Sequence, residues 1–396
     1  MKLEVFLKEK SEKASVSKPL ILDLQETKDQ ATLEILIKEH NIQRVVDDFE
    51  EQLKEYFQVT NPSIVYAKGF EEKFSAYLDE LQEKSPLWQQ GRWAYFPWLS
   101  TIVHLLEDKE FQLARTARNR NLITKEEQEK FYNAVIGIGG LSIGNSVALA
   151  IALQGGGQYI RLADFDTVSL SNLNRIRGGI EYLGLQKVEM TARQIYELNP
   201  YAIVDIFSEG LTKENINKFF EGPPKLDIVI DELDNIAIKY LLREQAKKHR
   251  TPLLMGADNG DNAVVDIERY DLDPQPKFFH GRIGETSYED LAKLDKFGIG
   301  KTITKHIGPE NVTQRMRQSL VEMGKTIVSW PQLGGTALLN GSAIAYCARK
   351  ILNNEPLASN RAIISFDELF IPEYNSPEEK QKRAKISEEF KKVFGL

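Results

Sequence analysis

A glycine-rich turn and the charged side chains that follow it are the residues whose types and spacing could do chemistry. In the run GIGGLSIG, Gly137, Gly139 and Gly140 come directly after an apolar segment. Glycines let the chain turn tightly and let its amides approach a phosphate, and the helix expected from about Leu141 points its positive end there. Ser142 stands where a third glycine is usual. The motif alone is weak, and a tight turn without a ligand is the alternative.

Two carboxylates end the next apolar segment. Asp164 stands where a carboxylate that binds ribose hydroxyls is expected, and Asp166 has an equal claim on sequence alone. Either one could instead cap a turn, which is common for Asp at the end of a strand. The pattern to this point predicts an adenine nucleotide, and NAD, FAD or ATP would satisfy it.

The cations beyond these carboxylates favour ATP. The segment SLSNLNRIRGG carries Asn172, Asn174, Arg175 and Arg177, and Lys187 opens the next helical pattern. A triphosphate needs more positive charge than a pyrophosphate diester. A lysine in a first helical turn opposes the helix dipole, so it indicates an anion nearby. The alternative for Lys187 is a solvated side chain that covers apolar surface.

A further acidic group, Asp231, Glu232 and Asp234, ends another apolar segment. Ligands of open parallel sheets bind beyond the carboxyl ends of the strands, where a carboxylate can hold Mg²⁺ against phosphates. The alternative is that Asp234 is the N-cap of the helix that starts at Asn235.

Apolar segments alternate with helical patterns from about Phe131 onwards. Repeated βαβ units of this kind predict an α/β fold, a doubly wound and mostly parallel sheet with helices on both faces. The strands are expected at 133–138, 158–165, 202–208, 226–232, 251–257 and 263–270, and the helices at 144–153, 185–198, 211–220 and 236–249. The glycine-punctuated segment 278–308 indicates a crossover or lid, and 334–352 indicates a late helix.

A smaller α/β module precedes this region. Strands are expected at 19–25 and 42–48, and amphipathic helices at 30–41 and 49–59. Segment 85–100 holds three of the four tryptophans, namely Trp88, Trp93 and Trp98. We expect an aromatic seam that packs the module on the next domain, with a binding surface as the alternative. The predicted domains are 1–100, 101–355 and a charged C-terminal extension, 356–396.

Composition excludes several classes of protein. The chain has 396 residues and a formal net charge of −7, which argues against a nucleic-acid partner. With Cys347 as the single cysteine, neither an intrachain disulfide nor a thiolate zinc site is expected. No apolar run reaches the roughly 20 residues of a membrane helix. The expectation is a soluble cytoplasmic protein without a membrane or nucleic-acid partner.

The order and spacing of the motifs resemble the ThiF/MoeB adenylyltransferase family, the bacterial relatives of ubiquitin-activating enzymes. The segments concerned are GIGGLSIG, LADFDTVSLSNLNR, GLQKVEMTARQIYELNP and VIDELDN. The resemblance runs from about Arg118 to Asp266, and more loosely to about Leu352. It implies a ThiF-type Rossmann-like fold and ATP-dependent activation of a carboxylate, such as a protein or peptide C-terminus, as an acyl-adenylate with release of pyrophosphate.

The resemblance also implies roles for single residues. Asp164 would bind the ribose, Asn172, Arg175 and Lys187 would hold the triphosphate, and Asp234 would position Mg²⁺. In ARNRNLIT, Arg120, with Arg118 as second choice, would reach the nucleotide of a partner subunit, which implies a homodimer.

Three points depart from the family or leave alternatives. The paired CxxC motifs of many relatives are absent, and Cys347 in AIAYCARKI is expected to be a buried packing residue without a chemical role. Residues 1–100 are a hypothetical substrate reader. A nicotinamide-dependent oxidoreductase, with His280 or His306 as proton donor, and a ThiF-like protein that binds a nucleotide without turnover are the competing functions.

Overall fold

The computed structural model describes residue 3 and residues 17–396, and the chain divides into two compact units. The first unit contains residues 1–129 and 192–202, and the second contains 130–191 and 203–396. The division into domains 1–100, 101–355 and 356–396 stays a prediction.

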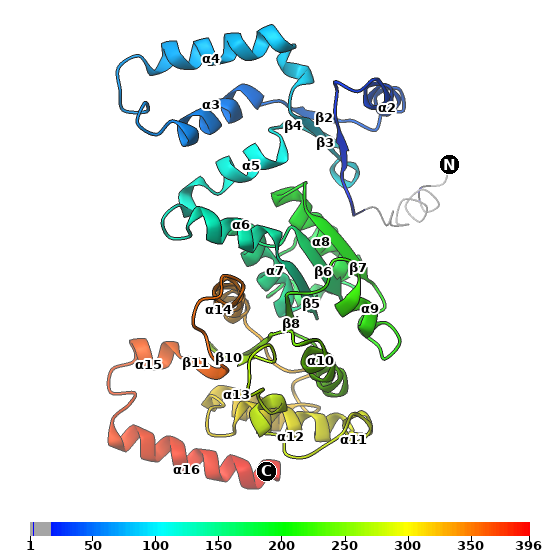
Figure 1. The fold of residues 1–396 in the computed structure, drawn as a ribbon. Coiled ribbons are helices and arrows are strands. Elements are labelled where there is room, and N and C mark those ends of the chain that lie inside the picture. Colours follow the sequence, from blue (N-terminus) through cyan, green and yellow to red (C-terminus); the bar gives the residue numbers. More distant parts are fainter. Residues whose placement is uncertain (1–2, 4–16) are drawn as a thin grey trace. The chain divides into compact units, whose positions relative to one another are not determined.

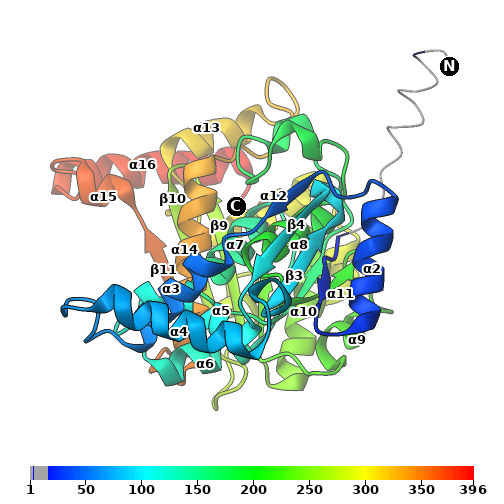
Figure 2. The same cartoon turned by 90° about the horizontal axis from the view of Figure 1, so that it is seen from above.

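The first unit is built on a four-stranded sheet with the order β1-β3-β4-β2 (Figure 1). The expected strands and helices of this module form, and α4, β3 and β4 are added to them. Helices α3 and α4 lie side by side (Figures 1 and 2) because Phe49, Leu53 and Phe74 share one apolar cluster. The elements are β1 Leu20–Leu22, α2 Thr27–Lys38, β2 Arg44–Val46, α3 Phe49–Thr60, α4 Phe70–Lys84, β3 Arg92–Phe96, β4 Thr101–Leu105, α5 Asp108–Arg115 and α6 Lys125–Asn133, the last of which crosses the unit boundary.

The three tryptophans of segment 85–100 have different surroundings. Trp93 is buried on β3 and stacks on His104, with 4.3 Å between the ring centroids. Trp98 donates a hydrogen bond from Nε1 to Glu197 Oε1 at 2.6 Å, and Trp88 is half exposed. The expected seam is therefore wrong for Trp93, because the alternation of β3 turns this side chain into the core of the module's own sheet.

The second unit contains a seven-stranded sheet with the order β11-β10-β9-β8-β5-β6-β7 (Figure 1). Strands β5 to β9 pair in parallel, and β10 and β11 are antiparallel additions. The predicted doubly wound α/β fold is confirmed, and β11 is the strand that the sequence pattern missed. The strands are β5 Val135–Gly139, β6 Tyr159–Ala163, β7 Ile203–Phe207, β8 Ile228–Asp231, β9 Leu253–Asn259, β10 Asn262–Glu268 and β11 Asn360–Ile364.

Helices α7 (Ile143–Leu153) and α14 (Gly334–Leu352) lie together on one face of the sheet (Figures 1 and 2). Both are rich in small residues, so their backbones approach closely. A Cβ atom on Gly341 would stand 2.8 Å from the carbonyl oxygen of Ser146. Helix α8 (Lys187–Leu198) begins beside α7, where Asn145 Nδ2 donates to Thr191 Oγ1 at 3.0 Å. The small residues thus set the packing of the layer that covers the glycine turn.

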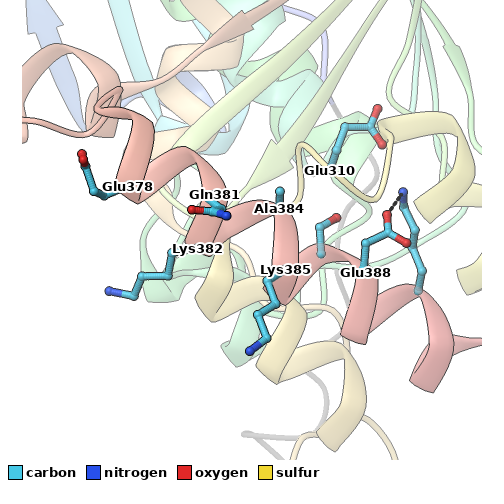
Figure 3. A pocket seen from close by; sticks show the side chains of 9 residues that line it. Glu310, Glu378, Gln381, Lys382, Ala384, Lys385 and Glu388 are labelled. Atoms are coloured by element: carbon cyan, nitrogen blue, oxygen red, sulfur yellow. Dashed lines mark hydrogen bonds and ion pairs between the residues drawn. The ribbon is translucent and has the colours of Figure 1, made fainter.

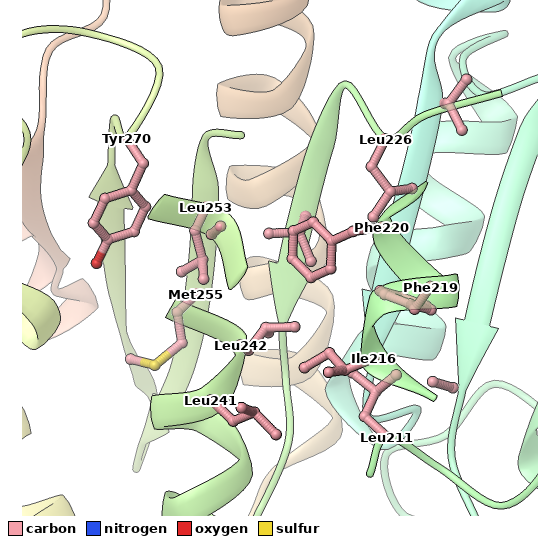
Figure 4. Packing of buried hydrophobic residues seen from close by; sticks show 14 residues of the cluster. Leu211, Ile216, Phe219, Phe220, Leu226, Leu241, Leu242, Leu253, Met255 and Tyr270 are labelled. Carbon is pink, nitrogen blue, oxygen red and sulfur yellow. The ribbon is translucent and has the colours of Figure 1, made fainter. Parts of the chain in front are cut away.

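The other face is covered by α9 (Ile216–Glu221) and α10 (Ile236–His249). Figure 4 shows Phe219 and Phe220 of α9 and Leu241 and Leu242 of α10 in one apolar cluster with strand residues such as Met255. Along each central strand, every second residue faces this cluster and the residues between face the helices on the other side of the sheet. These strands are therefore buried on both faces and are apolar along most of their length, as is typical of parallel sheets.

The segments after β10 complete the core. Residues 278–308 were expected to be a crossover or lid, but they form α11 (Tyr288–Ala292) and α12 (Lys296–Ile307), preceded by a short 3-10 turn. Ile307 packs with Val264 of β10, Met316 of α13 (Gln314–Glu322) and Phe390 and Phe394 of α16 (Pro377–Phe394). The segment is therefore part of a packed core. Helix α15 (Phe366–Phe370) links β11 to the residues before α16.

No helix in the described part of the chain has the length and apolar character needed to cross a membrane.

Candidate active site

The glycine turn joins β5 to α7 at the carboxyl edge of the sheet. Gly140 has a φ of +84°, and a Cβ atom there would stand 2.2 Å from the carbonyl oxygen of Glu232. Only glycine fits this position. The first amides of α7, from Ser142 onwards, have no carbonyl partner within the helix, so this end of α7 can bind an anion.

The other two glycines of the motif, Gly137 and Gly139, are explained by the side chains packed against them. Gly137 lies inside β5, and a Cβ atom on it would meet Leu226 at 2.7 Å and Phe219 at 2.8 Å. The expectation that Gly137 lets the chain approach a phosphate is therefore wrong, because this glycine makes room for the apolar cluster below the sheet. Gly139 ends the strand, and a Cβ atom there would stand 3.3 Å from Leu211 and Leu233.

Asp164 fixes the end of β6 to the glycine turn. Its Oδ2 accepts the Leu141 N–H at 2.7 Å, and its Oδ1 accepts the Asp166 N–H at 2.8 Å. The side chain is buried, and burial raises its pKa above the ordinary value despite the nearby Lys187 ammonium. The turn-capping alternative therefore describes real contacts of Asp164. Each carboxylate oxygen keeps a second lone pair, so the ribose role stays a prediction.

Lys187 begins α8 and is buried, which excludes the solvated-lysine alternative. Its Nζ lies 2.6 Å from Asp166 Oδ2 and 3.9 Å from Asp164 Oδ2. A lysine in a first helical turn is expected to have an anion nearby, and here Asp166 of the protein itself supplies that anion. Asp166 is about half exposed, so a phosphate can compete with it for the ammonium.

Arg175 reaches the start of α7. Its Nε donates to Ser142 Oγ at 2.8 Å, and its Nη1 donates to Asn174 Oδ1 at 2.9 Å. Burial lowers the pKa of this guanidinium, while the Asp234 and Asp258 carboxylates act in the opposite direction. The guanidinium therefore lies next to the amides that would receive a phosphate.

Asn172 supports the turn that carries Arg175. Its Oδ1 accepts the Ser169 N–H at 3.0 Å in a capping box, and its carbonyl accepts the Arg175 N–H at 3.0 Å. The structure gives Asn172 this local positioning task, and its direct contact with a triphosphate stays a prediction.

The acidic residues at the end of β8 and just after it have different surroundings. Asp231 is fully buried and binds Lys239 at 3.1 Å and Arg243 at 2.6 Å, which makes it part of a structural ion network. Asn235 is the N-cap of α10, because its Oδ1 accepts the N–H groups of Ala237 and Ile238. The alternative that Asp234 is the N-cap is therefore wrong. Its exposed carboxylate is left to interact with Arg175 and with ligands.

Sequence reasoning missed a buried carboxyl group, that of Asp258, whose charge acts on Arg175. Asp258, near the end of β9, accepts Asn340 Nδ2 at 2.7 Å and Gln332 Nε2 at 3.3 Å. Burial raises the pKa of this carboxyl to about 6. The signal in the sequence was Asp258 directly after the apolar strand segment, but its amide partners come from more than 70 residues further along the chain.

Three further residues singled out in the sequence are Arg118, Arg120 and Cys347. Arg118 and Arg120 are exposed residues of the first unit, so their approach to a partner's nucleotide stays a prediction. Cys347 is buried on α14, and burial raises its pKa to about 11. This agrees with a packing role, because a thiolate is the reactive form.

A surface hollow along α16 is not part of this site. Figure 3 shows it lined by Glu310 and by α16 side chains of both charges, among them Lys385 and Glu388. Among the described residues, no group of three or more His, Cys, Asp or Glu side chains is arranged to hold a metal ion without a further ligand.

The fold is an α/β protein of Rossmann-like architecture, and the polar groups of the candidate site lie at the point where the strand order reverses between β5 and β8. A model of the ThiF family matches residues 116–272. The chain belongs to the ThiF family.

Three similar proteins support this assignment. The uncharacterized protein MT1398 of Mycobacterium tuberculosis is 36% identical over 76% of this chain, and the chain spans only 42% of that protein. The molybdopterin-synthase adenylyltransferase of Haemophilus influenzae is 32% identical over 44% of this chain and 69% of its own length. The tRNA threonylcarbamoyladenosine dehydratase of Bacillus subtilis is 34% identical over 48% of this chain and 73% of its own length. The predicted family is confirmed.

The different tasks of Asp234 and Asn235 can be separated by stability. We expect Asn235→Ala to lower the free energy of unfolding by about 1 kcal/mol through loss of the helix cap. Asp234→Ala should change it by less than about 0.5 kcal/mol, because the carboxylate caps nothing. Urea unfolding of the two variants measures both values. A loss in Asp234→Ala as large as that in Asn235→Ala would assign this carboxylate a structural task.

Proposed function

We propose that the protein is an ATP-dependent adenylyltransferase that activates a substrate carboxylate as an acyl-adenylate and releases pyrophosphate. The proposal rests on one observation: Arg175, Lys187 and the amino end of α7 lie close together. They lie beside Asp164, the carboxylate expected to bind the ribose. An oxidoreductase would leave the two cations without a shared task.

The proposed reaction needs positioning and charge stabilisation more than covalent chemistry. An oxygen of the substrate carboxylate attacks the α-phosphorus, the new P–O bond forms, and the bond to the bridging oxygen of pyrophosphate breaks. Negative charge accumulates on the leaving pyrophosphate. Arg175 and Lys187 can stabilise that charge, and the α7 amides can hold the phosphates in line.

Both cations have partners within the protein, so nucleotide binding requires an exchange of partners. Lys187 would move from Asp166 to a phosphate oxygen, and Arg175 would move from Ser142 Oγ. Arg175 would exchange a neutral hydroxyl for a charge-assisted contact, and Lys187 would exchange one anionic partner for another. Asp166 is then free to turn to the ribose together with Asp164.

Asp234 suits Mg²⁺ as the carboxylate of a nucleotide-bound ion. Mg²⁺ with ATP is usually held by one or two carboxylates, phosphate oxygens and waters. An exposed carboxylate that caps no helix, next to Arg175, meets that requirement. When bound, the ion would neutralise charge on the phosphates. We propose Asp234 as its protein ligand.

The acyl group would pass to a nucleophile outside this chain. The one thiol, Cys347, is buried and has a raised pKa, so it is poorly suited to take the acyl group. For the acyl substrate we propose the C-terminus of a small protein or peptide, with residues 1–100 as its reader. The net charge of −7 argues against the phosphate backbone of an RNA substrate.

We also propose a homodimer in which Arg120, or Arg118, reaches the nucleotide of the partner subunit. Both side chains are exposed, as such a role requires. We expect the reaction in the cytoplasm, where ATP is supplied.

Calorimetric titration tests the nucleotide. Wild-type protein should bind Mg²⁺·ATP in preference to NAD⁺ and NADH, and removal of Mg²⁺ or Asp234→Ala should weaken binding. Arg175→Met should raise the Kd for Mg²⁺·ATP by at least about tenfold, because a charge-assisted contact is worth about 1.5–3 kcal/mol. Arg250→Met is the matched control, since Arg250 is exposed and lies at the opposite edge of the sheet, before β9. Preferred binding of NADH would contradict the proposal.

Isotope exchange tests the reaction. Radiolabelled pyrophosphate should enter ATP only when the protein is given peptides with free C-terminal carboxylates, and the same peptides with amidated C-termini should give no exchange. Arg175→Met should lower the exchange rate by about 100-fold or more, as expected for loss of a charge that stabilises the transition state. Equal exchange with amidated peptides, or formation of ADP in place of AMP, would exclude carboxylate adenylation.

A further inference from the structure

A buried carboxylate whose charge acts on Arg175 has no task in the reaction as described. Asp258 is 4% exposed and lies near the carboxyl end of β9. Each of its oxygens accepts one amide hydrogen bond, from Asn340 at 2.7 Å and from Gln332 at 3.3 Å. The residue opposite on β10 is the apolar Ala263, so Asp258 has no ion-pair partner across these two strands.

The charged residues that act on Asp258 or on its neighbours lie on the segment after β6, at the end of β8 and on α10. Arg175, on the segment after β6, is the cation whose charge acts on Asp258. Glu232 at the end of β8 is the neighbouring acid, and Lys239 of α10 acts on Glu232. Asp234 acts on the same guanidinium as Asp258. Helix α7 has no titratable side chain, and α14 contributes the neutral Asn340 amide at this level.

Two buried acceptor atoms lie near the Asn340 amide. Glu232 Oε2 and Asn340 Oδ1 are both buried acceptor atoms without a hydrogen-bond partner among the described residues. The Asn340 Oδ1 atom and the other carboxyl oxygen of Glu232 lie within 3.0 Å of where a Cβ atom on Gly256 would stand. Burial raises the pKa of Glu232 well above its ordinary value. The hydrogen bond to Asp258 Oδ1 sets the orientation of the Asn340 amide, with Nδ2 toward Asp258.

This arrangement conflicts with a bound triphosphate unless Asp258 changes its charge. Arg175 acts electrostatically on Asp258, and Gln332 contacts both Asp258 and Asn174, the neighbour of Arg175. A triphosphate bound at Arg175 would therefore add negative charge close to the Asp258 carboxylate, and two anions in a buried site repel each other. Protonation removes the repulsion. It also turns Asp258 from an acceptor into a group that can donate one hydrogen bond.

We propose that Asp258 is a further binding residue of the nucleotide site, which takes up a proton from solvent when Mg²⁺·ATP binds and faces the bound anion as the neutral carboxylic acid. This inference rests on the proposed function, because it assumes a triphosphate beside Arg175. The pKa of about 6 that burial gives Asp258 before binding supports it, since the acid form is then accessible near neutral pH.

The sign of the pH dependence follows from linkage. A group whose pKa rises on binding favours the complex at low pH and opposes it as pH rises through the free-state pKa. Binding of Mg²⁺·ATP should therefore weaken between about pH 6 and pH 8, by up to about tenfold per pH unit for one linked proton.

Calorimetry of Mg²⁺·ATP binding in two buffers with different ionisation heats measures the linked proton directly. At slightly alkaline pH, wild-type protein should take up close to one proton per nucleotide. Asp258→Asn should take up none, and its affinity for Mg²⁺·ATP should stay constant over the same pH range and equal or exceed that of the wild type at its upper end. Asp261→Asn removes an exposed carboxylate from the β9–β10 turn and should behave as wild type. Subtracting the proton uptake of Asp258→Asn from that of the wild type removes any contribution from the phosphates of ATP.

The wild-type titration is decisive without any variant. Binding of Mg²⁺·ATP without proton uptake would overturn this inference and leave the proposed function standing, as would equal uptake by wild type and a folded Asp258→Asn protein. Failure of ATP to bind at all would overturn the proposed function, and this inference with it.

Discussion

The hydrogen bond from the Leu141 N–H to Asp164 Oδ2, 2.7 Å long and buried, is the interaction on which the rest of the site depends. It joins the glycine turn after β5 to the end of β6, so that the helix terminus and the two aspartates form one rigid unit. Lys187 is then placed by its contacts with both aspartates, and Arg175 by its bond to Ser142 at the start of α7. These contacts bring the site residues together, with Arg175 and Lys187 bound to partners that a nucleotide would have to replace.

The two faces of the sheet divide the acidic residues at its carboxyl edge into structural and functional groups. On the α10 face, Asp231 is bound by Arg243, which also binds Glu268 at 2.8 Å, and breaking such a buried pair costs several kcal/mol. On the α14 face, Asp258 is held by neutral amides. Ion pairs fix the charge of the first group, whereas amide contacts leave Asp258 able to change its charge.

Much of this fold follows from local sequence patterns, because each βαβ unit repeats a strand period and a helix period within about 30 residues. The glycine turn, Asp164, Arg175 and Lys187 are found in the same way, since they lie close together in the chain. Contacts between distant segments escape such reasoning. The pairing of Asp258 with Asn340, the packing demand behind Gly137 and the capping of α10 by Asn235 depend on which side chains the fold brings together.

The central claim is that a triphosphate takes Arg175 and Lys187 from their present partners at the start of α7. A crystal structure of the protein with Mg²⁺ and a non-hydrolysable ATP analogue tests it most directly. The account predicts phosphate oxygens on the first amides of α7, with Arg175 moved from Ser142 Oγ and Lys187 moved from Asp166 to bind them. A nucleotide bound elsewhere, or bound with both of these contacts intact, would contradict the account.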